Sequence, residues 1–388
     1  MLHPDAALAA IEALGFSPRT EEVDLQAAPN RVLAEAIRSP LESPPFAKAA
    51  MDGYALAADD DSESFRVLET VAAGQVPARA LARGECAKIM TGAMLPEGAD
   101  KVVRVEYTEE HDGCMRLTRP EPDRNVIERG ENLRIGDPVL DRRRLRAQDI
   151  GVLASLGLAS VRVVRPPAVG VMATGSELRE PGRSLKAGQI YNSNGAQMCV
   201  QAADLGCPVR YFGIAADDPA ALGRSLAEAL DSCDLLLLSG GVSMGDFDFV
   251  PRLLTEAGAE IIFHKLAIKP GKPTLFARRD DRFVFGMPGN PVSSFIIFEL
   301  LVKPFLYRAM GLAYHPLLVR ARLTGTLRRR RTERVEYRPV RLSGGEIFPV
   351  PYHGSAHLNV LAEANALVRF EQGVKVLQEG EELDARSI

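Results

Sequence analysis

Cysteine is scarce in this 388-residue chain, and none of it is spaced for metal binding. The five cysteines are an odd number without a C-x-x-C pair, which predicts reduced thiols rather than a disulfide framework or a zinc site. His353 and His357 stand four residues apart, but no Glu or Cys nearby completes a zinc set. We therefore assign no role to the cysteines and expect the histidine pair to be structural.

Long apolar runs and an excess of basic residues are also missing. Glu299 and Lys303 interrupt the best apolar stretch before it reaches the roughly 18 residues that a membrane helix needs. The N-terminal segment lacks a basic region and has the pattern of an amphipathic helix, so it does not predict a secretory signal. The net charge of -4 argues against general nucleic-acid binding, and the basic runs at residues 142–144 and 328–331 are expected to be solvated loop or strand-edge charges. We expect a cytoplasmic protein that binds neither a membrane nor nucleic acid.

What the sequence does contain points to several domains. Its length and its 46% hydrophobic content favour two to four domains with separate cores. Residues 1–45 open with a helix and close in prolines, and residues 141–166 carry a short helix at 147–158, so together they predict a connecting arm. Residues 46–140 are short strand-like segments punctuated by glycine and proline, which is typical of a small β-rich subdomain.

The pattern changes after a pair of prolines at 166–167. In residues 167–313 strand-like runs alternate with helical ones, and Asn194 is expected to cap a helix that ends near Gly206. This alternation predicts right-handed βαβ units and a doubly wound sheet with helices on both faces. Residues 314–388 alternate with period two, so we expect the helices to stop and a closed or sandwiched β module to follow. The predicted fold class is multidomain α/β plus β.

Two glycine-rich turns stand out between residues 234 and 294. The first, Ser239-Gly240-Gly241, follows a continuous apolar run, as expected where a strand buried on both faces enters a tight loop. In the second, Asn290 is predicted to cap a helix and Pro291 to begin it. Free backbone N–H groups at such a helix terminus favour an anion.

Three lysines lie between these turns. Lys265, Lys269 and Lys272 are carried on a segment that Pro270 and Pro273 stiffen. Neither turn fits the Walker pattern or a dinucleotide fingerprint, so the residues by themselves predict a phosphate-type anion site and no particular nucleotide. The alternative is that the glycines only close turns between strands and helices, while the lysines are solvated.

Acidic residues also follow predicted strands. Glu177, Asp217 and Asp248 each come after a strand end, and ligands of open α/β sheets bind outside the carboxyl ends of the strands. We therefore expect these acids to gather at one rim with the lysines and the glycine-rich turns, where carboxylates suit Mg²⁺. The alternatives are helix caps, because one of Asp217 and Asp218 must cap the helix that starts at Pro219, and Asp248 stands where the cap of the next helix belongs.

Taken together, these segments resemble the molybdopterin molybdenumtransferases, the family that includes the gephyrin E domain, along nearly the whole chain. Eight motifs carry the resemblance in order, and their number makes it highly specific. They are PPFAKAAMDGYAL (44–56), GECAKIMTGAMLPEGAD (84–100), GVMATGSEL (170–178), GQIYNSN (188–194), LSGGVSMGDFD (238–248), KLAIKPGKP (265–273), GMPGNPVSS (286–294) and GSAHL (354–358).

The resemblance implies a fold, a reaction and partners. The implied fold has an elongated arm, a β-rich subdomain, a central domain like the molybdopterin adenylyltransferases and a C-terminal β-barrel. The implied reaction inserts molybdate into adenylylated molybdopterin, hydrolyses the pyrophosphate link, and releases AMP and Mo-molybdopterin, with Mg²⁺ or another divalent cation as cofactor. The implied assembly is a homodimer with a cleft shared between the subunits. A molybdopterin adenylyltransferase and cofactor-accepting molybdoenzymes would be its partners.

The resemblance also implies roles for individual residues. The catalytic group would be Asp52, Thr91, Asp217, Asp248, Lys265 and Lys269. The metal ligands would be Glu177, Asp217 and Asp248. Substrate and phosphate would be bound by Gly240, Gly241, Ser243, Lys272, Pro288, Gly289, Asn290, Pro291, Ser293, Arg338 and Ser355. Asp52 is expected to lie across the dimer cleft with Thr91 as its hydrogen-bonding neighbour, and Arg338 and Ser355 to hold molybdate.

Some positions depart from the family pattern. Family members often have Asp and Ser where this chain has Ala47 and Ala49, and often Asp where it has Asn132. An amide accepts hydrogen bonds but does not neutralise a cation, so the role of Asn132 is left open.

Two alternative functions are consistent with parts of this pattern. Adenylyl transfer to molybdopterin would need only the central domain, and the arm, the β-rich subdomain and the C-terminal module argue against it. A non-catalytic scaffold of the gephyrin kind would bind partner proteins, but it gives no reason to group the acids and lysines that are present here.

Overall fold

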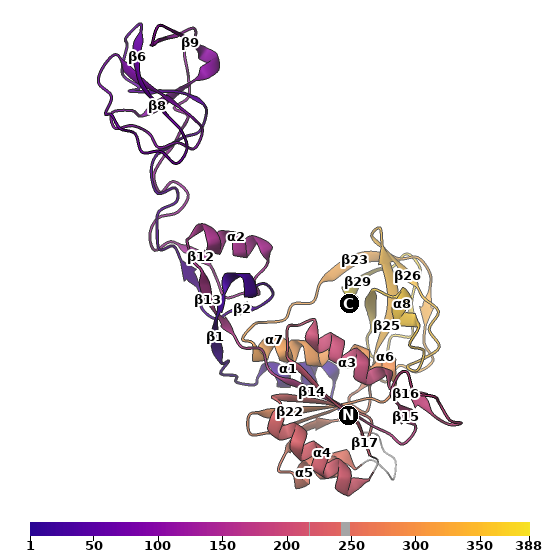
Figure 1. Cartoon of the computed structure of the whole chain (residues 1–388). Helices are drawn as coiled ribbons and strands as arrows, with labels where there is room; N and C mark the ends of the chain where they lie inside the picture. The colour runs from indigo at the N-terminus through magenta and orange to yellow at the C-terminus, as the bar shows by residue number, and fades with distance from the viewer. Residues whose placement is uncertain (217, 242–248) are drawn as a thin grey trace. The chain divides into compact units, whose positions relative to one another are not determined.

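The computed structural model describes residues 1–216, 218–241 and 249–388 (Figure 1). They form two compact units. The first comprises residues 1–23, 27–34 and 162–388, and the second comprises residues 24–26 and 35–161. In these ranges, no helix combines the length and the apolarity that crossing a bilayer requires.

The first unit is built on a six-stranded sheet that is parallel in its main part. The strand order is β17 (Val209–Ala215), β14 (Val169–Thr174), β18 (Leu235–Ser239), β22 (Arg282–Met287), β21 (Leu275–Arg279) and β19 (Glu260–His264). The first four strands are mutually parallel, whereas β21 and β19 are added antiparallel. Every residue of β14 and β18 is buried, as expected for parallel strands covered on both faces. The predicted α/β domain is therefore confirmed.

Helices cover both faces of this sheet because successive strand residues point to opposite sides. The covering helices form two groups, one on each face (Figure 1). Leu235 and Leu237 pack with one group, whereas Leu236 and Leu238 pack with the other. The first group is α1 (Pro4–Glu12), α3 (Ser193–Ala203), α6 (Pro291–Ile297), the π-helical η3 (Phe298–Val302) and α7 (Lys303–Ala309). The second group is α4 (Pro219–Ser232) and α5 (Val250–Glu256).

Two predicted helix caps have different outcomes. Asp218 does cap α4, since its carboxylate accepts a 2.8 Å hydrogen bond from the Ala221 N–H. The prediction for Asn194 is wrong, because Asn192 caps α3 and accepts from the Gly195 N–H at 3.0 Å. Asn194 lies inside the first turn, where it is buried.

The C-terminal part of the first unit is a closed barrel of five strands. These are β25 (Val335–Ser343), β26 (Glu346–Pro349), β23 (Leu318–Leu323), β29 (Glu382–Ser387) and β27 (Ala366–Phe370), and β27 pairs back onto β25. The predicted β module is confirmed, although a one-turn helix, α8 (Val360–Glu363), interrupts it. A short strand of the central part, β20 (Ile268–Lys269), pairs in parallel with β25 and joins the barrel to the α/β part.

The second unit is mainly β structure. Its six-stranded sheet has the order β8 (Lys101–Arg104), β5 (Gly53–Leu56), β7 (Glu85–Ile89), β6 (Phe65–Val71), β10 (Cys114–Leu117) and β9 (Thr108–His111). Two-stranded ribbons pair β4 (Lys48–Ala49) with β11 (Val126–Ile127) and β3 (Ile37–Arg38) with β12 (Pro138–Leu140), and the unit also has the turn η2 (Val105–Tyr107) and the helix α2 (Ala147–Ser155).

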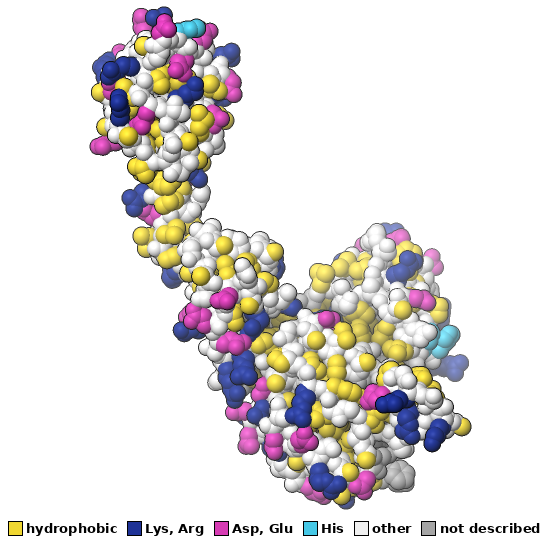
Figure 2. Space-filling model, in the orientation of Figure 1, with side chains coloured by type: hydrophobic (Ala, Val, Ile, Leu, Met, Phe, Trp, Pro, Cys, Tyr) yellow, Lys and Arg dark blue, Asp and Glu magenta, His cyan; other side chains and the backbone are white. Residues whose placement is uncertain are grey.

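The remaining elements are short. A three-stranded sheet of β1 (Thr20–Asp24), β13 (Ser160–Val164) and β2 (Val32–Leu33), with the turn η1 (Leu25–Ala27), lies where the chain passes between the units. Two further ribbons pair β15 (Leu178–Arg179) with β16 (Ile190–Tyr191) and β24 (Leu327–Arg328) with β28 (Val376–Leu377). On the face drawn in Figure 2, charged side chains of both signs are interspersed, which fits the small net charge of -4.

The turn after β18 requires glycine at its first position. Gly240 has φ +93°, and a Cβ added there would lie 2.2 Å from the Thr174 carbonyl oxygen. We expect Gly240→Ala to lower the free energy of unfolding by about 2–4 kcal/mol, because backbone strain and a steric clash add. Gly258→Ala is the control, since Gly258 has φ +82° with no atom near the added Cβ, and it should cost about 1 kcal/mol. Urea unfolding of both variants checks this, and equal losses would contradict the clash.

Candidate functional site

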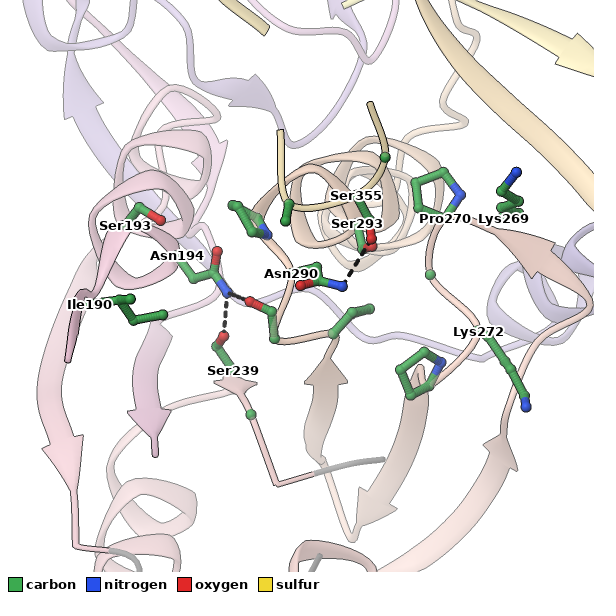
Figure 3. A pocket seen from close by; sticks show the side chains of 18 of the residues that line it. Ile190, Ser193, Asn194, Ser239, Lys269, Pro270, Lys272, Asn290, Ser293 and Ser355 are labelled. Atoms are coloured by element: carbon green, nitrogen blue, oxygen red, sulfur yellow. Dashed lines mark hydrogen bonds between the residues drawn. The ribbon is translucent and has the colours of Figure 1, made fainter. Parts of the chain in front are cut away.

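A cavity of about 1190 Å³ opens at the carboxyl ends of β14 and β18 (Figure 3). Residues from loops of the α/β part and from the barrel line it together. It brings together many of the residues that the sequence singled out, although they are far apart along the chain. They are Glu177, Gly240, Lys269, Lys272, Pro288, Gly289, Asn290, Pro291, Ser293, Arg338 and Ser355.

Other predicted site residues lie elsewhere. Gly241 and Lys265 are not among the lining residues, and the Lys265 backbone instead bonds to Leu2 and Thr274. Asp52, Thr91 and Asn132 belong to the second unit. Asp217, Ser243 and Asp248 lie outside the described residues.

Asn194 connects the two glycine-rich turns at the cavity. Its side-chain Nδ2 donates to Ser239 Oγ at 2.7 Å and to the Gly289 carbonyl oxygen at 2.8 Å (Figure 3). Sequence reasoning gave Asn194 only a capping role and missed this contact. Because Ser239 belongs to the first turn and Gly289 to the second, the amide fixes the two turns relative to each other.

Asn290 has a different partner from the one predicted. The helix α6 does begin at Pro291, but the Asn290 side chain forms no cap and donates from Nδ2 to Ser355 Oγ at 2.9 Å instead (Figure 3). The Ser355 carbonyl oxygen accepts the Val292 N–H at 3.1 Å. The expectation that this terminus leaves its N–H groups free is therefore wrong for Val292, because a loop of the barrel region occupies it.

A buried carboxylate joins two of the predicted cations. Glu336 Oε2 lies 3.1 Å from Lys269 Nζ, and Glu336 Oε1 lies 2.6 Å from Arg338 Nη2. Glu336 lines the same cavity, but sequence reasoning did not single it out. The signal that was available is strand alternation, which places residues 336 and 338 on one face of β25.

The basic run at residues 328–331 is only partly solvated. Arg330 is exposed and lines the cavity, but the Arg329 side chain is fully buried, so the expectation of solvated charges is wrong for Arg329. Its guanidinium donates to the carbonyl oxygens of Arg334 and Val374 at 2.6 Å each, and burial lowers its pKa. Arg329 therefore acts as a structural cation of the barrel.

Of the three predicted metal ligands, Glu177 is the one that lies within the described residues, and it lines the cavity. It follows β14, and the nearby Gly175 has φ +153°, a backbone conformation that favours glycine. Within the described ranges, no group of three or more His, Cys, Asp or Glu side chains is arranged to hold a metal ion.

In the second unit, Thr91 and Asp52 form the expected contact. Asp52 Oδ1 accepts hydrogen bonds from both the hydroxyl and the backbone N–H of Thr91, each at 2.7 Å. These two hydrogen bonds lower the pKa of the Asp52 carboxyl, and the bond from the Thr91 hydroxyl has the larger effect. The exposed Asp52 side chain therefore stays ionised to a lower pH than an ordinary aspartate.

Thr91→Val removes the hydroxyl donor but keeps the backbone N–H, so we expect the pKa of Asp52 to rise partway toward its ordinary value. Carboxyl-carbon NMR across a pH titration measures it. Thr108→Val is the control, because the Thr108 hydroxyl donates to the Val105 carbonyl oxygen and not to a carboxylate. An unchanged pKa of Asp52 in Thr91→Val would contradict the assigned cause.

Comparisons with known proteins agree with this architecture along the chain. Residues 2–157 match the family model "MoeA N-terminal region (domain I and II)", residues 170–308 match "Probable molybdopterin binding domain", and residues 320–387 match "MoeA C-terminal region (domain IV)". A crystal structure of the molybdopterin biosynthesis MoeA protein from Pyrococcus horikoshii superposes with a TM-score of 0.88 at 33% identity, covering 100% of this chain and 99% of that one.

Two relatives with similar sequences are both named molybdopterin molybdenumtransferase. The molybdopterin molybdenumtransferase of Haemophilus influenzae is 38% identical over 306 residues, which is 78% of this chain and 76% of that protein. The molybdopterin molybdenumtransferase of Staphylococcus aureus is 33% identical over 375 residues, which is 93% of this chain and 90% of that protein. The chain therefore belongs to the MoeA family of molybdopterin molybdenumtransferases.

Proposed function

We propose that this protein is a molybdopterin molybdenumtransferase that inserts molybdenum into molybdopterin during biosynthesis of the molybdenum cofactor. The observation that carries this conclusion is the match of three family models in order along the chain, together with relatives of that name at 38% and 33% identity. The cavity adds a chemical argument, because its lining is rich in groups that bind anions.

The substrates in this proposal are adenylylated molybdopterin and molybdate, and the products are AMP and Mo-molybdopterin. Hydrolysis of the pyrophosphate link builds negative charge on phosphoryl oxygens, and cations fixed in advance stabilise that charge. Five basic side chains line the cavity: Lys269, Lys272, Arg330, Arg334 and Arg338. Lys272 is exposed there and makes no ion pair within the described chain, so its ammonium is available to a phosphoryl group.

A divalent cation, Mg²⁺, completes the proposed chemistry. Mg²⁺ is bound by one or a few carboxylates together with substrate phosphate oxygens. Glu177 lines the cavity and supplies one carboxylate. Asp217 and Asp248, which lie outside the described residues, are the other proposed ligands. The cation would neutralise charge on the phosphoryl oxygens while the link is hydrolysed.

The proposed assembly is a homodimer in which each site takes residues from both chains. Asp52 and Thr91 would face the cavity of the partner subunit, where an ionised carboxylate complements the cationic lining. The two hydrogen bonds from Thr91 support this role, since they hold one oxygen of the Asp52 carboxylate in a defined orientation. An adenylyltransferase would deliver the adenylylated pterin, and molybdoenzymes would accept the product.

AMP release tests the proposed reaction. Purified protein with Mg²⁺, molybdate and adenylylated molybdopterin should release AMP, and Lys269→Ala should slow this by roughly a hundredfold, because one preorganised cation is lost. Lys375→Ala is the matched control, since Lys375 is exposed and does not line the cavity. Chromatographic quantification of AMP gives the rates.

Two outcomes of this assay would count against the proposal. No AMP release by the unaltered protein, with pterin binding retained, would favour the scaffold alternative. Release that persists after chelation of divalent cations would contradict the metal dependence, whereas loss on chelation and recovery with added Mg²⁺ would support it.

Mixed dimers test the shared cleft. A dimer of one Asp52→Ala chain and one Lys269→Ala chain has both changes in one site and neither in the other, so we expect it to recover roughly half of the unaltered activity. Differently tagged chains, co-expressed and purified through both tags, supply this dimer. The two homodimeric variants are the controls, and mixed dimers no more active than these would exclude the shared geometry.

A further inference from the structure

Glu336 is a buried carboxylate surrounded by three cations. Its side chain has no exposed area, and Lys269, Arg338 and Arg329 approach its oxygens at 3.1, 2.6 and 4.0 Å. A carboxylate removed from water is costly unless it is paired and hydrogen-bonded. Because no role assigned above requires a carboxylate here, its presence needs a reason.

Two features of the fold place the cations around it. The parallel pairing of β20 with β25 sets Lys269 directly opposite Glu336. Strand alternation puts Arg338 on the same face of β25 as Glu336. The guanidinium groups of Arg329 and Arg338 both lie over the Phe370 ring, 5.2 and 5.3 Å from its centroid, which restricts their orientation.

The three cations differ in what they can still bind. Arg329 is fully buried and donates to backbone carbonyl oxygens, so it is committed to the barrel. Lys269 and Arg338 line the cavity, and their side chains are 42% and 16% exposed. Glu336 thus offsets one of three positive charges and leaves a net excess on the two groups that reach the cavity.

We propose that Glu336 is a positioning residue that holds the Lys269 ammonium and the Arg338 guanidinium side by side, so that their remaining N–H donors bind one tetrahedral oxyanion. The proposal rests on the proposed function, for which the oxyanion is either free molybdate or a phosphoryl group of the nucleotide. Lys269 uses one of its three donors on Glu336. Arg338 uses two of its five, one on Glu336 and one on the Arg328 carbonyl oxygen at 3.0 Å, so both side chains keep donors for the ligand.

A role in positioning and a role in charge balance predict opposite effects of Glu336→Gln. If Glu336 only offset positive charge, the amide would raise the local positive potential and tighten oxyanion binding. If Glu336 positions the two cations, the amide loses two charge-assisted hydrogen bonds and binding weakens. We expect the dissociation constant to rise by roughly ten- to a hundredfold.

The first experiment is calorimetric titration of the full-length protein with molybdate and, separately, with AMP. Glu299→Gln is the matched control, because Glu299 is also buried and paired with a lysine, Lys303 at 2.8 Å, but does not line the cavity. Both variants should melt at lower temperature, and only Glu336→Gln should bind more weakly. Weaker binding of molybdate alone assigns the free ion as ligand, and weaker binding of AMP alone assigns the phosphoryl group. Unchanged or tighter binding of both would overturn the proposal.

Two further variants separate positioning from stability. Glu336→Asp keeps the negative charge that Arg329 needs, but its shorter side chain draws the carboxylate away from Lys269 and Arg338. This variant should therefore stay folded and still bind the oxyanion more weakly. It replaces Glu336→Gln in the test if Glu336→Gln does not fold. In a Lys269→Ala/Arg338→Ala background, Glu336→Gln should cause no further loss of affinity, because the groups it acts through are gone. An equal further loss would overturn the proposal. The binding results stand apart from AMP release, so failure of the proposed function is recognised separately.

Discussion

The pairing of β20 with β25 is the contact on which the cavity depends. It is only two residues long, yet it joins the α/β part to the barrel and fixes Lys269 opposite Glu336. A second contact, between Asn290 and Ser355, ties the barrel region to the start of α6. The walls of the cavity thus come from two folding motifs whose relative position is set by short backbone and side-chain contacts. This arrangement lets residues from distant parts of the sequence act on one ligand.

Electrostatics explains why the site contains an acid that sequence reasoning overlooked. A site for polyanions needs cations. Cationic side chains held close together repel each other, however, and this repulsion destabilises the arrangement that would bind the ligand. The carboxylate of Glu336 relieves this repulsion and directs the side chains at the same time. Lys272 shows the alternative, because it is exposed and its orientation is left to solvent and ligand.

Much of the fold was predictable because its signals are local. Continuous apolar runs such as residues 235–238 indicate buried parallel strands, and Asp218 before Pro219 indicates a helix start. The gathering of turns at one cavity followed from the rule that parallel strands end on the same side. The Thr91 contact with Asp52 came from the family resemblance.

The errors share a physical cause. Asn194 and Asn290 both looked like helix caps, since asparagine at a helix start normally bonds to the local backbone. In the fold, each finds a partner distant in sequence: Ser239 and Gly289 for Asn194, and Ser355 for Asn290. Arg329 looked solvated because arginine usually is, but the barrel supplies backbone carbonyl oxygens that accept its donors. Local propensity cannot anticipate such long-range contacts.

The closure of the barrel restricts how the length of β25 can vary. Glu336 and Arg338 share a strand face with Val340, which packs in the barrel core, whereas Val335 and Tyr337 pack toward the α/β core. Inserting or deleting one residue within this strand would exchange the two sets, driving a valine and a tyrosine to the charged side and two ionised groups into apolar surroundings. Gly344 and Gly345 form the hairpin turn beyond the last pair, Ser343 with Glu346, so an insertion there leaves the faces of β25 unchanged.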